Sequence, residues 1–211
     1  DKIKEYAEPI IENQRAYAEK QGYCYAVYKG NLAHDNGIFR APYWSKIVAI
    51  SDQSKKAKPG NWIVWMDASA IVTNTDQEFR KIIDTHGKGK DVILTTDAYQ
   101  KGVPNIEDQG TPINNAVFAF QWNDWTRDWL QKIWSRSDLS IGGQGNCGNI
   151  HFPHCHYEQQ AMTELWKKDS SVRDHTALIS NRKMNSFYRF SHIDYERGLF
   201  LDYDNDDQEK S

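Results

Sequence analysis

The strongest constraint on the fold is a short run that is apolar at every position, Trp62-Ile-Val-Trp-Met66, followed directly by Asp67. A run that is apolar on both alternating faces is typical of a central parallel strand covered by helices on each side. Residues 91–96 are expected to form another buried strand, and Asp97 is the first charge after it. Ligands of such sheets bind beyond the carboxyl ends of the strands. We therefore expect both aspartates at a ligand-binding edge.

Helical patterns alternate with these runs along the chain. Apolar residues at three- and four-residue steps predict helices, and Asn123 is suited to cap one of them. The alternation predicts an α/β sandwich with a mostly parallel central sheet, in one domain over residues 1–200 with an acidic tail or linker at 201–211. Helices are expected at 3–18, 43–57, 75–86 and 158–168, with one more after Asn123 that carries Trp125 to Trp134, and further strands are expected at 23–28 and 116–120.

Composition and charge narrow the class of protein. The 211 residues carry 26 basic and 29 acidic side chains, and five of the acids fall in the last ten residues. The rest of the chain is near neutral, which argues against a nucleic-acid partner. No apolar run approaches the roughly 18 residues of a membrane span, and three cysteines are too few for a disulfide scaffold. A soluble protein of a reducing compartment such as the cytoplasm is expected.

The residues after the strand at 62–66 have the chemistry of a cation site. Asp67 and Ser69 are two positions apart and can ligate one ion together. Oxygen donors favour Mn²⁺ or Mg²⁺, which usually keep several waters and bind substrate phosphates. The alternative is that Asp67 only forms a turn.

Residues 62–73 resemble the Asp-x-Asp region of nucleotide-sugar glycosyltransferases with the Rossmann-like GT-A fold. The resemblance is to the galactomannan galactosyltransferase and xyloglucan xylosyltransferase family, glycosyltransferase family 34, in which a tryptophan-rich strand runs into this motif. Ser69 stands in the third position of the motif, and a hydroxyl is a weaker ligand than a carboxylate.

Three more stretches are similar to motifs of this family and follow in its order, at residues 43–46, 113–118 and 157–162. Two family residues differ, because Ala116 replaces a glycine and Tyr157 replaces the first acid of a pair. The resemblance implies these roles: Lys46 faces the donor diphosphate, Asn114 and Asn115 lie near the donor sugar, and Glu158 and Gln159 lie beside the transferring sugar.

The resemblance implies a metal-dependent transfer, with retention, of a hexose-type sugar from a nucleoside-diphosphate donor such as a UDP-sugar to a glycan or glycoprotein acceptor. Glu158, Gln159 and Asp97 are the candidates for steadying the oxocarbenium-like centre. His192 is the candidate to replace the terminal metal-binding histidine of the family. The family's first strand and its terminal His-Phe motif are not visible in the sequence, and in this and in its length the chain is similar to a glycosyltransferase domain of a large algal virus.

Two other functions compete with this interpretation. A non-catalytic sugar-binding module would use Trp44, Trp122 or Trp125 to stack on carbohydrate. A zinc-dependent interaction module would use Cys147–His156, which holds five potential ligands in ten residues but matches no standard finger spacing. Lys46 can also be read as a helix lysine that extends to water.

Overall fold

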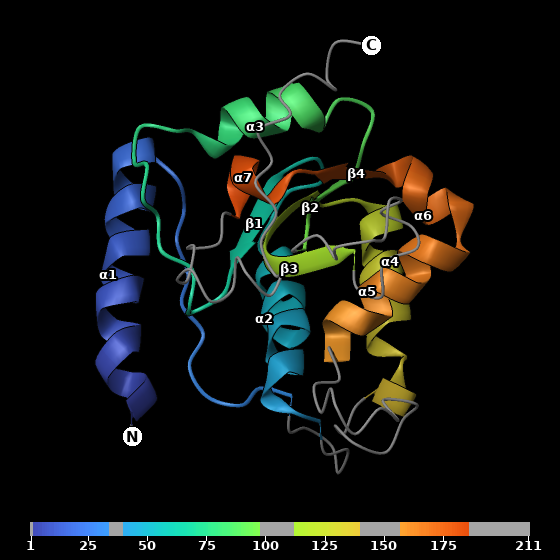
Figure 1. Cartoon of the computed structure of the whole chain (residues 1–211), viewed down its shortest axis with the longest axis horizontal. Helices are drawn as coiled ribbons and strands as arrows, with labels where there is room; N and C mark the ends of the chain where they lie inside the picture. The colour runs from blue at the N-terminus through green and yellow to red at the C-terminus, as the bar shows by residue number, and fades with distance from the viewer. Residues whose placement is uncertain (1, 34–39, 98–111, 140–156, 186–211) are drawn as a thin grey trace, which may run out of the picture.

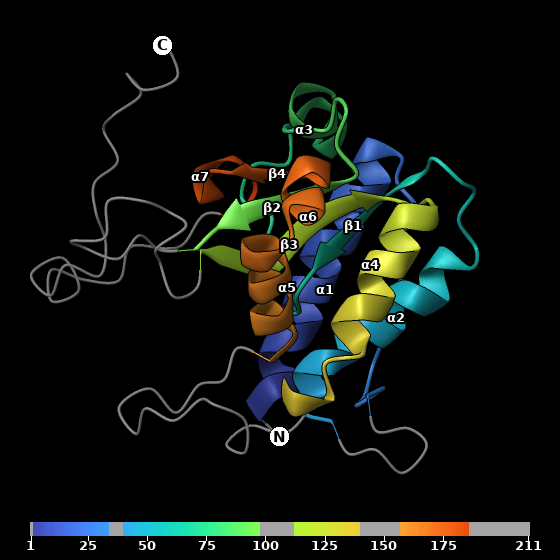
Figure 2. The same cartoon turned by 90° about the vertical axis from the view of Figure 1, so that its right-hand side faces the viewer.

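The computed structural model describes residues 2–33, 40–97, 112–139 and 157–185. Over these residues the chain forms a four-stranded sheet with helices on both faces (Figures 1 and 2). No helix in this part of the chain is both long enough and apolar enough to cross a membrane. The elements are α1 (Lys2–Gln21), η1 (Pro42–Trp44), α2 (Ser45–Ser54), β1 (Trp62–Met66), α3 (Phe79–His86), β2 (Val92–Thr96), β3 (Ile113–Gln121), α4 (Asp124–Trp134), η3 (Ser137–Leu139), α5 (Tyr157–Lys168), α6 (Ser170–His175), β4 (Thr176–Ile179) and α7 (Asn181–Met184).

The strands lie in the order β1-β3-β2-β4. β2 and β4 are parallel, whereas β3 lies between β1 and β2 and is antiparallel to both. Three strands, β1, β2 and β4, therefore run in one direction, and β3 returns between them. The α/β architecture is as expected, with a sheet of mixed pairing.

β1 is an edge strand among the described strands, and all five of its residues are half-buried. The expectation of a central strand was wrong, although the reason for its apolar pattern was right. Ile63 and Trp65 pack against one core cluster, and Trp62 and Val64 pack against the other. Both faces of β1 are covered, although among the described strands it pairs along one edge only.

Two core clusters lie on opposite faces of the sheet. The larger one joins α2, α4 and α5 to the sheet, and β3 contributes Phe118 and Phe120. The smaller one joins α3 to the sheet and contains Ala119, which lies between those two phenylalanines. Successive residues of a strand point to opposite faces, so one strand serves both clusters.

Helix α1 stands beside the sheet and contacts the loop that follows β1 (Figure 1). Asn13 donates to the carbonyl of Val72, and Gln21 donates to the carbonyl of Thr75. This helix therefore holds the segment that begins at Asp67.

The segment 23–28 does not form the expected strand. Its aromatic side chains instead join neighbouring helices: the Tyr25 hydroxyl reaches Gln14 of α1, and the Tyr28 hydroxyl donates to Asp52 of α2. A β-rich composition does not form a strand without a sheet edge to pair with. The sequence patterns also missed α6, β4 and α7, and the acidic tail 201–211 lies outside the described residues.

Candidate functional site

The topology brings polar residues to one edge of the sheet. Asp67 follows β1 and Asp97 follows β2, and these strands run in the same direction. Because β3 runs the opposite way, its first residues lie at this edge as well. Asn114 and Asn115 are among those first residues. The expected ligand-binding edge thus holds residues from three strands.

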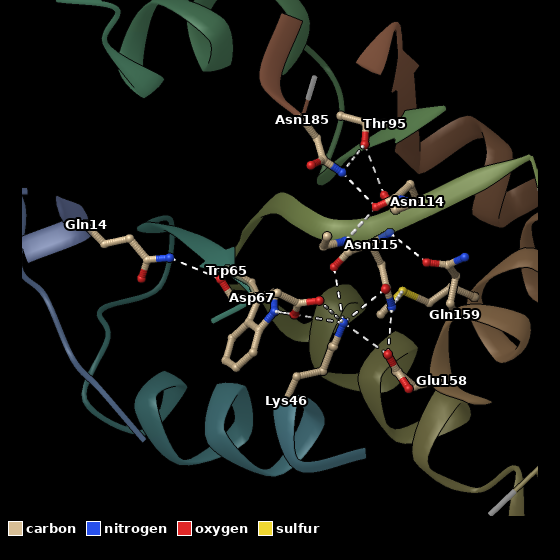
Figure 3. A network of polar contacts seen from close by, with 12 residues as sticks. Gln14, Lys46, Trp65, Asp67, Thr95, Asn114, Asn115, Glu158, Gln159 and Asn185 are labelled. Carbon is tan, nitrogen blue, oxygen red and sulfur yellow. Dashed lines mark hydrogen bonds and ion pairs between the residues drawn. The ribbon is translucent and has the colours of Figure 1, made fainter. Parts of the chain in front are cut away.

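Lys46 occupies the centre of a compact polar cluster at this edge (Figure 3). Its Nζ lies 3.1 Å from Asp67 Oδ1 and 3.0 Å from Glu158 Oε1, and it donates to Asn115 Oδ1 over 3.0 Å. We call Lys46, Asp67, Asn115 and Glu158 the lysine cluster. Its members come from α2, the end of β1, the start of β3 and the first turn of α5. Lys46 is only 5% exposed, so it does not extend to bulk water.

Burial changes the acidity of Glu158. A buried charge is costly unless it is paired and hydrogen-bonded. Burial raises the pKa of Glu158 above its usual range, and the opposing effects of Lys46 and the hydrogen bond from Asn115 do not cancel it. Glu158 Oε1 holds both of these contacts, while its Oε2 is buried and has no hydrogen-bond partner among the described residues.

Asp67 remains the most accessible acid of the lysine cluster. Its Oδ1 accepts a hydrogen bond from the Trp65 indole over 2.6 Å, and its side chain keeps 31% of its surface exposed. The turn after β1 is closed by the main chain, since the N–H of Ala70 donates to the Asp67 carbonyl. The Asp67 carboxylate is therefore directed at Lys46 and does not cap the turn.

The neighbouring residues Asn114 and Asn115 make contacts on opposite faces of the sheet. Asn114 Nδ2 donates to Asp97 Oδ1 over 3.3 Å. Asn115, the next residue, points to the opposite face, and its N–H donates to Gln159 Oε1 over 3.1 Å. The two asparagines connect Asp97 and the start of α5 to the lysine cluster.

The donor set suits a hard cation only in part. Asp67 and exposed Ser69 are the two candidate oxygen ligands, and so small a set would suit a cation that is held mainly by substrate phosphates and water. The described residues hold no group of three or more His, Cys, Asp or Glu side chains placed to bind a metal ion. His192 and the segment Cys147–His156 lie outside the described residues.

The tryptophans of the competing sugar-binding hypothesis are largely occupied by packing. Trp44 is completely buried, which excludes stacking on a ligand. Trp122 and Trp125 are partly buried against the main core, and Trp125 stacks on His175 with 4.3 Å between ring centroids. A hollow of about 710 Å³ does exist, but Trp62, Asp91 and His175 line it at the opposite edge of the sheet.

Tyr157 precedes Glu158 in a left-handed backbone conformation, with φ of 38°. Such a conformation costs a non-glycine residue about 1–3 kcal/mol, and residues of this kind cluster at functional sites. The Tyr157 ring stacks on Tyr43, one turn before Lys46, with centroids 4.7 Å apart. The stack links the start of α5 to η1, which directly precedes α2.

Three contributors to the site were missed by the sequence analysis: Gln14, Trp65 and Asn185. Trp65 could have been found, because residues two apart on a strand share a face and Trp65 precedes Asp67 by two. Gln14 donates to the carbonyls of Asp67 and Ala70 from a helix more than fifty residues away. Asn185 follows α7 and reaches Asn114. No sequence pattern connects these last two with the site.

Fold and geometry define an α/β protein with a polar site at the carboxyl edge of a mixed sheet. The model of the galactosyl transferase GMA12/MNN10 family matches residues 1–202, and the chain belongs to this family of glycosyltransferases.

Curated relatives agree with this membership. An alpha-1,2-galactosyltransferase of Schizosaccharomyces pombe is 30% identical over 201 residues, covering 86% of this chain and 51% of the relative. An uncharacterized alpha-1,2-galactosyltransferase of the same organism is 24% identical and covers 88% of this chain and 52% of the relative. The chain thus spans about half the length of these relatives.

A solved structure shares the fold. It is a glycosyltransferase involved in the glycosylation of the major capsid of PBCV-1, with a TM-score of 0.59 and 15% sequence identity. The similarity covers 83% of this chain and 77% of that one.

Proposed function

We propose that this protein transfers a hexosyl group, with galactosyl as the first candidate, from a UDP-sugar to a glycan acceptor in a metal-dependent reaction that retains the anomeric configuration. The observation that carries the proposal is the lysine cluster at the carboxyl edge of the sheet. Galactosyl is the first candidate because the similar curated proteins are named galactosyltransferases.

Asp67 and Ser69 are the residues that would hold Mn²⁺ or Mg²⁺ together with the donor diphosphate. When bound, the cation would supply Lewis-acid stabilisation of the negative charge that gathers on the leaving nucleoside diphosphate. Lys46 does not neutralise Asp67 completely, because Glu158 shares the same ammonium group. Asp67 therefore keeps a local negative potential that favours a cation.

The burial of Lys46 and Glu158 changes the roles proposed for them. Both side chains are 6% exposed or less, so neither reaches a substrate in this conformation. Lys46 acts on the diphosphate through its field at close range, and Glu158 positions Lys46 and Asn115. Asp97, Asn114 and Gln159 are left as the candidates for contacts with the sugar. Among the described residues Glu158 is too buried to attack the anomeric carbon, so front-face attack by the acceptor is the proposed route.

Calorimetric titration with UDP-galactose and UDP-glucose, with and without Mn²⁺, tests this function. We expect binding that depends on Mn²⁺ and slow hydrolysis of one donor. Asp67→Asn keeps an acceptor for the Trp65 indole but removes the charge, and it should weaken Mn²⁺-dependent binding at least tenfold.

The matched control is Asp128→Asn, which removes one charge from an exposed position of α4 and should bind as the wild type does. Equal affinity with Mn²⁺ and with EDTA would contradict the metal-dependent mechanism. If neither donor binds under either condition, the proposed donor class is wrong.

A further inference from the structure

Asn185 lies one residue beyond α7 and reaches across the sheet edge to Asn114 (Figure 3). Its Nδ2 is 2.7 Å from Asn114 Oδ1 and 3.4 Å from Thr95 Oγ1. The short C-terminal helix is thereby tied to the start of β3.

The orientation of the Asn114 amide follows from an unambiguous donor. The main-chain N–H of Ala116 lies 3.0 Å from one terminal atom of Asn114. A main-chain N–H can only donate, so that atom must be the oxygen. Asn185 donates to the same oxygen, which then has both lone pairs in use. The amino group of Asn114 is thus the end that faces Asp97.

The orientation of Asn185 follows from its two neighbours. The Thr95 hydroxyl is completely buried and donates its one hydrogen to the Asn114 carbonyl over 3.0 Å. Toward Asn185 it can only accept. Both groups beside the Asn185 amide are therefore acceptors, and only an amino group satisfies them.

We propose that Asn185 is a positioning residue that holds Asn114 as a hydrogen-bond donor toward the donor sugar. Asn114 Nδ2 carries two hydrogens, and Asp97 takes one of them among the described residues. An N–H donor beside a carboxylate matches a sugar hydroxyl, which accepts from the first and donates to the second. This inference rests on the proposed function and specifies which part of the nucleotide sugar is recognised here.

Asn185→Asp tests the inference, because it keeps the shape of the side chain and replaces its donor by an acceptor. The control is Lys183→Ala, an exposed residue of the same short helix. Dissociation constants for UDP-galactose and for UDP alone would be measured with Mn²⁺, alongside the melting temperature. Asn114 is proposed to contact only the sugar. Asn185→Asp should therefore raise the dissociation constant for UDP-galactose at least tenfold and change the dissociation constant for UDP less than twofold.

Asn185→Ala is a second variant, for the case that Asn185→Asp does not fold. It should also weaken the binding of UDP-galactose but not of UDP, by a smaller factor. Lys183→Ala should leave both constants within twofold. The inference is wrong if the Asn185 variants weaken the binding of UDP and of UDP-galactose equally, or weaken the binding of neither. Donor binding by the wild type would still stand in that case. If the wild type binds UDP-galactose no more tightly than UDP, the proposed function is wrong, and the inference about Asn185 falls with it.

Discussion

At the scale of single residues, the site depends on a buried lysine ammonium that is shared by two carboxylates. Lys46 and Glu158 are nearly inaccessible, whereas Asp67 is partly exposed. Removing one partner of a buried pair leaves an uncompensated charge, which typically costs 3–5 kcal/mol. The lysine cluster is therefore a place where substitutions affect both the stability of the fold and the geometry of the site.

The raised pKa of Glu158 gives a signed pH dependence of stability. A group whose pKa is higher in the folded than in the unfolded state stabilises the fold below its ordinary value of about 4.5. This stabilisation is lost as the pH rises through the folded value. The free energy of unfolding of the wild type, measured relative to Glu158→Gln by urea denaturation, should therefore fall as the pH rises from 4 toward neutral.

Glu164 of the same helix provides a control of opposite sign. Burial raises its pKa, but hydrogen bonds from Lys168, Gln160 and Arg136 together outweigh burial and lower it. Relative to Glu164→Gln, the wild type should lose stability as the pH falls. If the two differences run in the same direction, the assignment for Glu158 is wrong.

At the scale of secondary-structure elements, α1 acts on the site through the loop after β1. Gln14 donates to the Asp67 carbonyl over 3.0 Å and to the Ala70 carbonyl over 2.7 Å, and it is 6% exposed. These bonds hold the loop where it carries Asp67 and Ser69. The helix thus contributes to the site without presenting a side chain to a ligand.

Gln14→Ala removes both bonds and also the acceptor of the Tyr25 hydroxyl. At about 0.5–1.5 kcal/mol for each of the three bonds, the free energy of unfolding should fall by about 1.5–4.5 kcal/mol. The loosened loop should also weaken Mn²⁺-dependent binding of UDP-galactose, measured by calorimetry. Gln21→Ala is the matched control, because it removes one bond from the same helix to the same loop at Thr75. Equal donor affinities in the two variants would show that α1 does not position the site.

At the scale of the whole molecule, stability is unevenly distributed. β2 and β3 lie in the middle of the sheet, and both contribute completely buried residues to the cores. α1 buries only Ile11, Tyr17 and Ala18 among the apolar residues described for it, and many of its contacts to the loop 67–77 are hydrogen bonds. Elements with few buried apolar contacts open at lower free energy.

Hydrogen exchange followed by mass spectrometry should show this order. Peptides covering 113–121 should exchange only through global unfolding. Peptides covering 7–21 should exchange faster and together with the loop 67–77, because α1 and this loop hold each other. If α1 were protected as strongly as β3, the claim that α1 opens at a lower free energy than the central strands would be wrong.

Much of the fold and several site residues could be predicted from local sequence. The bounds of β1 were read directly from its apolar run, and Asn123 caps α4 as expected, accepting from the N–H of Thr126. The expectation that Asp67 and Asp97 share an edge needed only that their strands run in the same direction. The periodicity of apolar residues predicts which side chains are buried. A carboxylate directly after a buried strand indicates where the chain leaves the core.

The sequence by itself thus determined the α/β class, the family resemblance and the edge at which the polar residues gather. Only the tertiary structure decided that β3 runs antiparallel between β1 and β2, that Lys46 is buried between two carboxylates, and that Gln14 and Asn185 hold the site residues in place. The physical reason is the range of the interactions. Burial along one element has a period that can be read locally, whereas strand pairing and hydrogen bonds between residues fifty or more positions apart depend on how the elements pack.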